Sequence, residues 1–172
     1  DDPGNSYYQA RQALLDHVNI PVDNVHRIQS DSSKSSGQRL EPATVAMDYA
    51  RTLKNFSTAP LEWPRFDLVL LGMGDDGHTA SLFPGSQVDI ALPTVAVKAN
   101  YQDRPANRVS LTPLVFNSAR QIIFLVSGQS KSIALASILN GEYQPKLLPA
   151  QRIRSTDGET IWLVDEAAAS KL

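Results

Sequence analysis

FDLVLLGMGDDGHTASLFPG, residues 66–85, carries the strongest structural signals of the chain. Its first six residues, 66–71, are a nearly unbroken apolar run, which is typical of a strand buried on both faces of a parallel sheet. Gly72, Gly74 and Gly77 follow, and their small size lets the backbone turn sharply and approach a ligand closely. The stretch therefore predicts a buried strand that ends in a tight loop.

His78 comes directly after the last of these glycines. The sequence predicts that it starts a short helical piece over residues 79–83, which a Pro-Gly pair ends. An imidazole beside a Gly-rich turn at the carboxyl end of a buried strand lies where open α/β sheets place their chemistry. We therefore predict that His78 is catalytic and take Asp75 as a second catalytic candidate, whereas Asp76 is as well explained as a cap of the helical piece.

Two phosphate-binding motifs match this loop in part, and we reject both. GMGDDG, residues 72–77, fits the dinucleotide fingerprint G-x-G-x-x-G, but the helix after it is short and the next predicted strand, 94–98, ends in a lysine instead of an acidic residue. Residues 72–79 also resemble a Walker A loop with His78 at the lysine position. Without that lysine, and with two carboxylates inside the loop, a triphosphate would be repelled.

A much longer resemblance covers nearly the whole chain. The run LGMGDDGHTASLFPG resembles the signature of 6-phosphogluconolactonases. Near the start, the chain has Asn5-Ser6-Tyr7 where that family often has Ser-Asn-Tyr. Other family-like stretches follow in the family's order: NRVSLT (107–112), SGQSK (127–131), LPA (148–150) and WLVDEAA (162–168).

The resemblance implies a hydrolase that opens 6-phospho-D-glucono-1,5-lactone to 6-phosphogluconate in the oxidative pentose phosphate pathway, without a cofactor. Histidine titrates near neutrality, so it suits a base that activates water. Backbone N–H groups of the turn between Gly72 and Gly77 are candidates to stabilise the oxyanion. We expect no metal site, because the loop lacks a second histidine or a spaced carboxylate pair. The implied substrate-binding residues are Gly72, Gly74, Gly77, Arg108, Lys131, Asn5 and Ser6.

Strands that alternate with helices predict an α/β fold with a mainly parallel, Rossmann-like sheet flanked by helices, and the resemblance implies the sugar-phosphate isomerase/deaminase type. Since residues 66–71 and 121–126 both end in glycine turns, His78 and Lys131 are predicted on the same edge of the sheet. Predicted strands are 24–28, 66–71, 94–98, 108–111, 121–126 and 161–164; predicted helices include 5–18, one from 41 or 42, and one that ends at 141; polar loops are expected at 30–38 and 100–105.

Composition sets limits on the location and partners of the protein. The 172 residues suit a single domain, and the net charge of −2 gives no general attraction to nucleic acid or anionic lipid. No apolar run approaches the ~20 residues of a membrane span. No cysteine is present, which fits a reducing compartment, and no signal peptide is visible. We therefore expect a cytoplasmic protein with no nucleic-acid or membrane partner and predict no oligomeric state, and the resemblance implies a small sugar-phosphate lactone as the partner.

Two other functions remain open on the sequence alone. Hexosamine-6-phosphate isomerase/deaminases have a similar Gly-x-Asp-Gly-His loop, but residues 79–84 here, TASLFP, are of the lactonase type. A noncatalytic sugar-phosphate-binding domain is the other alternative. Family members carry a further N-terminal segment, with a Gly-rich phosphate loop and an Asp-Glu-Arg stretch, before the point that matches Asp1. Residues 1–172 thus resemble the C-terminal two-thirds of a catalytic domain, and we expect them alone to fold but to be poorly active.

Overall fold

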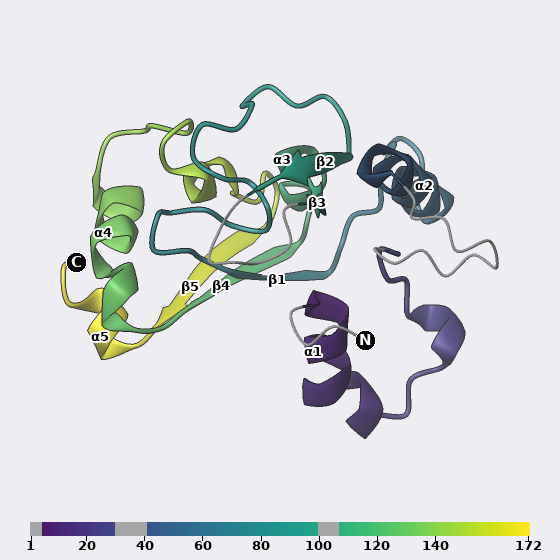
Figure 1. Ribbon diagram of the computed structural model, residues 1–172, viewed down its shortest axis with the longest axis horizontal. Helices are drawn as coiled ribbons and strands as arrows, with labels where there is room; N and C mark the ends of the chain where they lie inside the picture. Colours follow the sequence, from purple (N-terminus) through teal and green to yellow (C-terminus); the bar gives the residue numbers. More distant parts are fainter. Residues whose placement is uncertain (1–4, 30–40, 100–106) are drawn as a thin grey trace.

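The computed structural model describes residues 5–29, 41–99 and 107–172 (Figure 1). This part of the chain contains a three-stranded parallel sheet in the order β1-β4-β5. Its strands are β1 (Leu68–Gly72), β4 (Gln121–Val126) and β5 (Glu159–Val164). Gln121 of β4 is in register with Leu68 of β1 and with Glu159 of β5. The predicted α/β fold with a parallel sheet is confirmed.

A separate antiparallel pair accompanies this sheet. β2 (Thr94–Lys98) and β3 (Asn107–Leu111) form it, with Val97 opposite Arg108. Both segments were predicted as strands, but they stand outside the parallel sheet. The Thr94 hydroxyl donates a hydrogen bond of 2.7 Å to the Ala46 carbonyl, which ties the pair to a helix. The predicted loops 30–38 and 100–105 lie outside the described residues.

The core lies on one face of the parallel sheet, where buried side chains from three of the α-helices pack against it. Phe124 of β4 is fully buried and stacks on Trp162 of β5, with ring centroids 3.9 Å apart. Leu135 is also fully buried against this face. The helices are α1 (Ser6–Ala13), α2 (Pro42–Asn55), α3 (Pro113–Phe116), α4 (Ser132–Asn140) and α5 (Glu166–Ala169), with 3₁₀ helices Leu15–His17, Val22–Asn24, Gln129–Lys131 and Pro149–Arg152.

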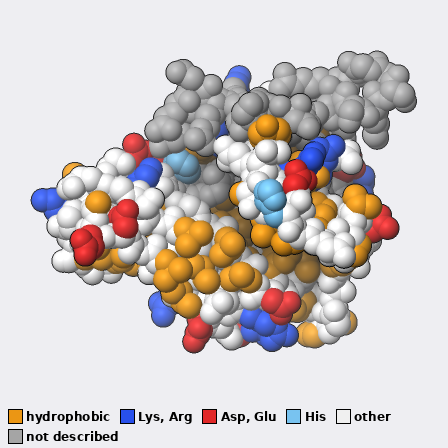
Figure 2. All heavy atoms as spheres, turned by 90° about the horizontal axis from the view of Figure 1, so that it is seen from below, with side chains coloured by type: hydrophobic (Ala, Val, Ile, Leu, Met, Phe, Trp, Pro, Cys, Tyr) orange, Lys and Arg blue, Asp and Glu red, His pale blue; other side chains and the backbone are white. Residues whose placement is uncertain are grey.

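The other face of the sheet is open, and the prediction that the first strand is buried on both faces is wrong. Val69 and Leu71 are each 8% exposed, whereas Leu68 is 48% and Leu70 is 58% exposed. Leu125 and Leu163 extend this open face across β4 and β5. Seen from below the view of Figure 1, hydrophobic side chains gather in a patch beneath the sheet (Figure 2). Successive strand residues point to opposite faces, and the core occupies only one of them.

The N-terminal part departs further from prediction. The first helix ends at Ala13, well before Val18, and no residue of α1 is buried. Residues 24–28 do not form the predicted strand. The His26 carbonyl accepts a hydrogen bond of 2.9 Å from the Tyr49 hydroxyl of α2, and the His26 ring packs 4.5 Å from Phe56. A strand needs backbone partners in a neighbouring strand, and here this segment rests on a helix instead.

Candidate active site

The loop after β1 folds back on itself and returns His78 to the end of the strand. The Thr79 hydroxyl donates to the Gly72 carbonyl at 2.8 Å, and the Gly74 N–H donates to the His78 carbonyl at 2.8 Å. The Gly77 N–H donates to the Gly74 carbonyl at 3.1 Å. With Thr79 only 1% exposed, these bonds fix both ends of the loop. In this conformation the amides of Gly74 and Gly77 hold the turn together.

Asp76 binds His78 at two points. Its Oδ1 lies 2.7 Å from the imidazole Nδ1 and accepts the backbone N–H of His78 at 3.0 Å. The Asp76 side chain is 33% exposed, and the His78 side chain is 14% exposed. Since an ionised carboxylate only accepts hydrogen bonds, the proton of a neutral imidazole lies on Nδ1 and the lone pair on Nε2. In this tautomer Nε2 of His78 is a candidate base.

The pairing of Asp76 with His78 is not predicted from the sequence, which explains Asp76 as well by a helix cap and makes Asp75 the second catalytic candidate. The signal was present in the spacing Asp76-Gly77-His78, because the glycine lets the carboxylate fold back over its own loop. Asp75 is exposed, and its catalytic role stays a prediction.

At two of the glycines, a Cβ would come too close to neighbouring side chains unless these shifted. A Cβ on Gly74 would lie 2.1 Å from His78 Nδ1 and 2.6 Å from Asp76 Oδ1. Gly77 has φ +79°, and a Cβ there would meet the Leu148 side chain at 2.9 Å. Gly72 has open space at this position. Substrate binding by these three glycines stays a prediction.

The helical piece predicted over residues 79–83 is wrong. Residues 79–82 form a tight turn in which the Leu82 N–H donates to the Thr79 carbonyl at 2.9 Å. Ala80 has φ +51°, a left-handed value that no α-helix contains. The turn buries the side chains of Thr79, Ser81 and Leu82. His78 therefore does not stand at a helix N-terminus.

The segment 146–150 is hydrogen-bonded to this loop through the backbone. The Ala150 N–H donates to the Gly77 carbonyl at 3.0 Å, and the Gly85 N–H donates to the Lys146 carbonyl at 2.8 Å. These bonds anchor the chain before His78, at Gly77, and after it, at Gly85. The family-like LPA stretch thus has a structural role beside the candidate base.

Arg108 lies close to the His78 loop. Its guanidinium carbon is 5.8 Å from the centroid of the Phe83 ring, and that ring is 4.6 Å from the imidazole of His78. The Ser81 N–H donates to the Ser110 hydroxyl at 3.2 Å and so links the loop to β3. The structure therefore brings a cation and the candidate base together around one aromatic ring.

Lys131 lies at the same edge of the sheet as the His78 loop, as predicted. It ends the 3₁₀ helix that follows β4, and β4 runs parallel to β1 with Leu125 opposite Gly72. The Gly128 N–H donates to both carboxylate oxygens of Asp165, at 3.1 and 3.0 Å. This fixes the backbone from which Lys131 extends.

Asn5 and Ser6 lie at the start of α1. The Asn5 side chain accepts the Tyr7 N–H at 2.8 Å and so caps the helix. The main contact of α1 is with the 3₁₀ helix Leu15–His17. Substrate binding by Asn5 or Ser6 stays a prediction.

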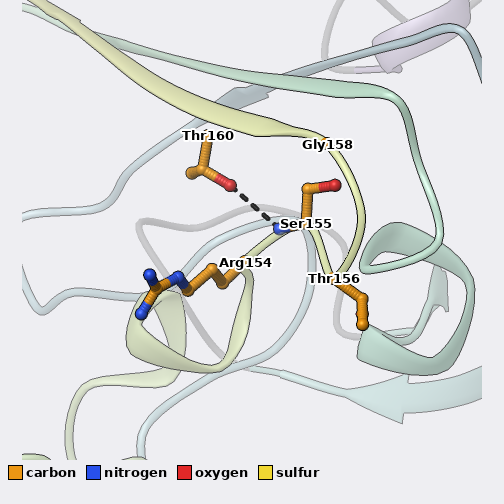
Figure 3. A pocket seen from close by; sticks show the side chains of 5 residues that line it. All are labelled: Arg154, Ser155, Thr156, Gly158 and Thr160. Atoms are coloured by element: carbon orange, nitrogen blue, oxygen red, sulfur yellow. Dashed lines mark hydrogen bonds between the residues drawn. The ribbon is translucent and has the colours of Figure 1, made fainter.

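A hollow of about 530 Å³ lies elsewhere, next to the amino end of β5 (Figure 3). Inside it the Ser155 N–H donates to the Thr160 hydroxyl at 2.9 Å, while the Arg154 side chain extends away from both residues. Ligands of open α/β sheets bind at the carboxyl ends of the strands, so we assign this hollow no role. Its lining residues are Arg154, Ser155, Thr156, Gly158 and Thr160.

Two further findings concern only the described ranges 5–29, 41–99 and 107–172. They contain no cluster of three or more acidic or histidine side chains suited to a metal ion. They also contain no helix of the length and apolarity that a membrane crossing requires.

Comparison with known proteins gives one consistent family. The family model described as glucosamine-6-phosphate isomerases/6-phosphogluconolactonase matches residues 1–162. A 6-phosphogluconolactonase of Synechocystis is 37% identical over 173 aligned positions, and one of Nostoc is 36% identical. Each alignment covers 100% of this chain and 68% of the relative.

Solved structures agree with these sequence matches. The 6-phosphogluconolactonase of Trypanosoma brucei superposes with a TM-score of 0.78 and 30% identity, over 96% of this chain and 67% of that one. A monomeric glucosamine-6-phosphate deaminase has a TM-score of 0.77 but only 19% identity, over 100% of this chain and 69% of that one. The second likeness concerns the fold alone.

Proposed function

The chain belongs to the glucosamine-6-phosphate isomerase/6-phosphogluconolactonase family, and on this premise we propose that it hydrolyses 6-phospho-D-glucono-1,5-lactone to 6-phosphogluconate. This is the hydrolytic step of the oxidative pentose phosphate pathway. The observation that carries the proposal is the Asp76–His78 pair, held at 2.7 Å at the carboxyl end of a parallel strand. The absence of cysteine from the sequence supports a cytoplasmic location as part of the same proposal.

His78 acts first as the base. Asp76 accepts a hydrogen bond from Nδ1–H, so Nε2 is free to take a proton from water while the water oxygen bonds to the lactone carbonyl carbon. A correctly placed base of this kind contributes ~10²–10⁴ in rate. The negative charge that develops on the carbonyl oxygen accepts hydrogen bonds from N–H groups of the turn 72–77 other than those of Gly74 and Gly77, which are used within the turn.

His78 then acts as the acid. The tetrahedral intermediate collapses, the bond between the carbonyl carbon and the ring oxygen breaks, and Nε2–H returns its proton to that oxygen. The products are a carboxylate, after loss of its proton to solvent, and a free hydroxyl group. The imidazole regains its starting state, and the side chains of the site complete the cycle without a cofactor.

Arg108 and Lys131 bind the phosphate in this proposal. Both are cations near the carboxyl edge of the sheet, Arg108 beside Phe83 and Lys131 after the turn at Gly128. Charge-assisted hydrogen bonds to phosphate oxygens are short and strong. The two residues therefore hold the end of the substrate that does not react.

Lys131→Ala should weaken binding more than chemistry. Loss of one charge-assisted contact costs about 1.5–3 kcal/mol, so KM for the phosphorylated lactone should rise while kcat changes little. The non-phosphorylated glucono-1,5-lactone should be affected much less. Steady-state kinetics on both lactones measure this, with Lys54→Ala on the exposed side of α2 as control. An equal loss on the two lactones would refute the phosphate contact.

The function itself is tested with the complete wild-type protein. Proton release from freshly prepared 6-phosphogluconolactone, corrected for spontaneous opening, should be fast and enzyme-dependent. Glucosamine 6-phosphate, assayed for ammonia release, should not react. Ammonia release without lactone hydrolysis would favour the deaminase function instead.

A further inference from the structure

Phe83 contacts two side chains to which the proposed mechanism gives different tasks. Its ring centroid lies 4.6 Å from that of the His78 imidazole, with the planes tilted by 35°. The guanidinium carbon of Arg108 lies 5.8 Å from the same centroid. One aromatic side chain therefore touches both the base and a cation assigned to the phosphate.

The contact belongs to a larger junction between the His78 loop and β3. Arg108 and Ser110 are alternate residues of β3 and so point to the same side of the strand. Ser110 accepts the Ser81 N–H at 3.2 Å, and its own hydroxyl donates to the Leu111 carbonyl at 2.8 Å. The loop thus contacts the strand at two points, Ser81 with Ser110 and Phe83 with Arg108. On both the loop and the strand, the two contacting residues are two positions apart.

The two contacts of Phe83 depend on its ring. The imidazole of His78 is fixed at Nδ1 by Asp76, and packing against the Phe83 ring restricts its remaining rotation. The face of an aromatic ring also attracts a guanidinium at this distance. A branched aliphatic side chain would fill much of the space but would offer no such face.

We propose that Phe83 is a positioning residue that sets the separation between His78 and Arg108. The site thereby selects lactones whose phosphate lies at one fixed distance from the carbonyl carbon. This inference rests on the proposed lactonase function, because His78 and Arg108 act on opposite ends of the substrate only in that reaction.

Phe83→Leu is the main test, in the complete protein with the phosphorylated and non-phosphorylated lactones. Because misplacement of a base is costly, kcat should fall about tenfold on both lactones. Loss of the cation–π contact should raise KM about two- to fivefold on the phosphorylated lactone, with no change of KM on the other. Phe83→Tyr keeps the aromatic ring and should have the wild-type kcat and KM on both lactones. Phe83→Met provides a second non-aromatic variant if the leucine variant does not fold.

Phe56→Leu is the matched control. Phe56 packs on His26 at 4.5 Å, a similar ring pair outside the site, so its loss should leave both kinetic constants unchanged. In an Arg108→Ala background, Phe83→Leu should no longer raise KM for the phosphorylated lactone, because the partner is already absent.

The inference is overturned if Phe83→Leu changes KM for both lactones alike, or if its phosphate-selective effect persists without Arg108. It is also overturned if the leucine and methionine variants have wild-type kinetics, as the tyrosine variant is expected to have. A wild-type protein that hydrolyses neither lactone would reject the proposed function, and this inference with it.

Discussion

His78→Ala is expected to lower the rate of lactone hydrolysis by about 10²–10⁴-fold. The substitution removes the group that takes the proton from water and returns it to the ring oxygen. Asp76 is not placed to replace it, because its Oδ1 still accepts the backbone N–H of residue 78. The rate should be measured as proton release from fresh 6-phosphogluconolactone by the complete protein.

The fold should survive this change. The His78 side chain is 14% exposed and lies at the rim of the core rather than inside it. Its backbone keeps the hydrogen bonds to Gly74 and Asp76, so the thermal transition should stay close to that of the wild type. His17→Ala, in the N-terminal 3₁₀ helix Leu15–His17, is the control for loss of an imidazole. An alanine variant at position 78 with the wild-type rate would show that His78 is not the base.

Local features of the site could be predicted from the sequence, because they depend on neighbours in the chain. An apolar run followed by closely spaced glycines needs only local conformational preferences to become a strand and a turn. The placement of His78 and Lys131 on one edge needed only the parallel order of two strands, which β1 and β4 confirm. Pairing of Asp76 with His78 depends on how the turn closes, and the bond from the Thr79 hydroxyl to the Gly72 carbonyl closes it.

Features set by distant parts of the chain were not predictable. The apolar run 66–71 fits a strand with one covered face as well as a strand with two covered faces. In the structure only one face is covered, and Leu68 and Leu70 are exposed. Residues 24–28 have strand-like composition but rest against α2 through Tyr49. The place of Phe83 follows from the docking of the loop on β3, which no local pattern indicates. Tertiary contacts override local preference in each case.

Gly74→Ala should be nearly as damaging as loss of the imidazole, although it removes no functional group. A Cβ at this position would lie 2.1 Å from His78 Nδ1 and 2.6 Å from Asp76 Oδ1. Both atoms belong to side chains that must shift to make room, and we expect this shift to break the 2.7 Å contact between the base and the carboxylate that orients it. A misplacement of about 1 Å can cost on the order of 10²-fold in rate, and we expect at least that loss in kcat on both lactones.

Gly158→Ala distinguishes this effect from simple destabilisation. A Cβ on Gly158 would lie 2.0 Å from the Arg120 carbonyl oxygen, at the amino end of β5 and therefore at the opposite edge of the sheet. Both variants should unfold at lower temperature than the wild type, because each introduces a steric conflict. Below that transition, only Gly74→Ala should lose kcat. If the two variants lose stability and rate in the same proportion, the glycine at position 74 serves the fold alone, and the fixed distance between Asp76 and His78 is not what the reaction requires.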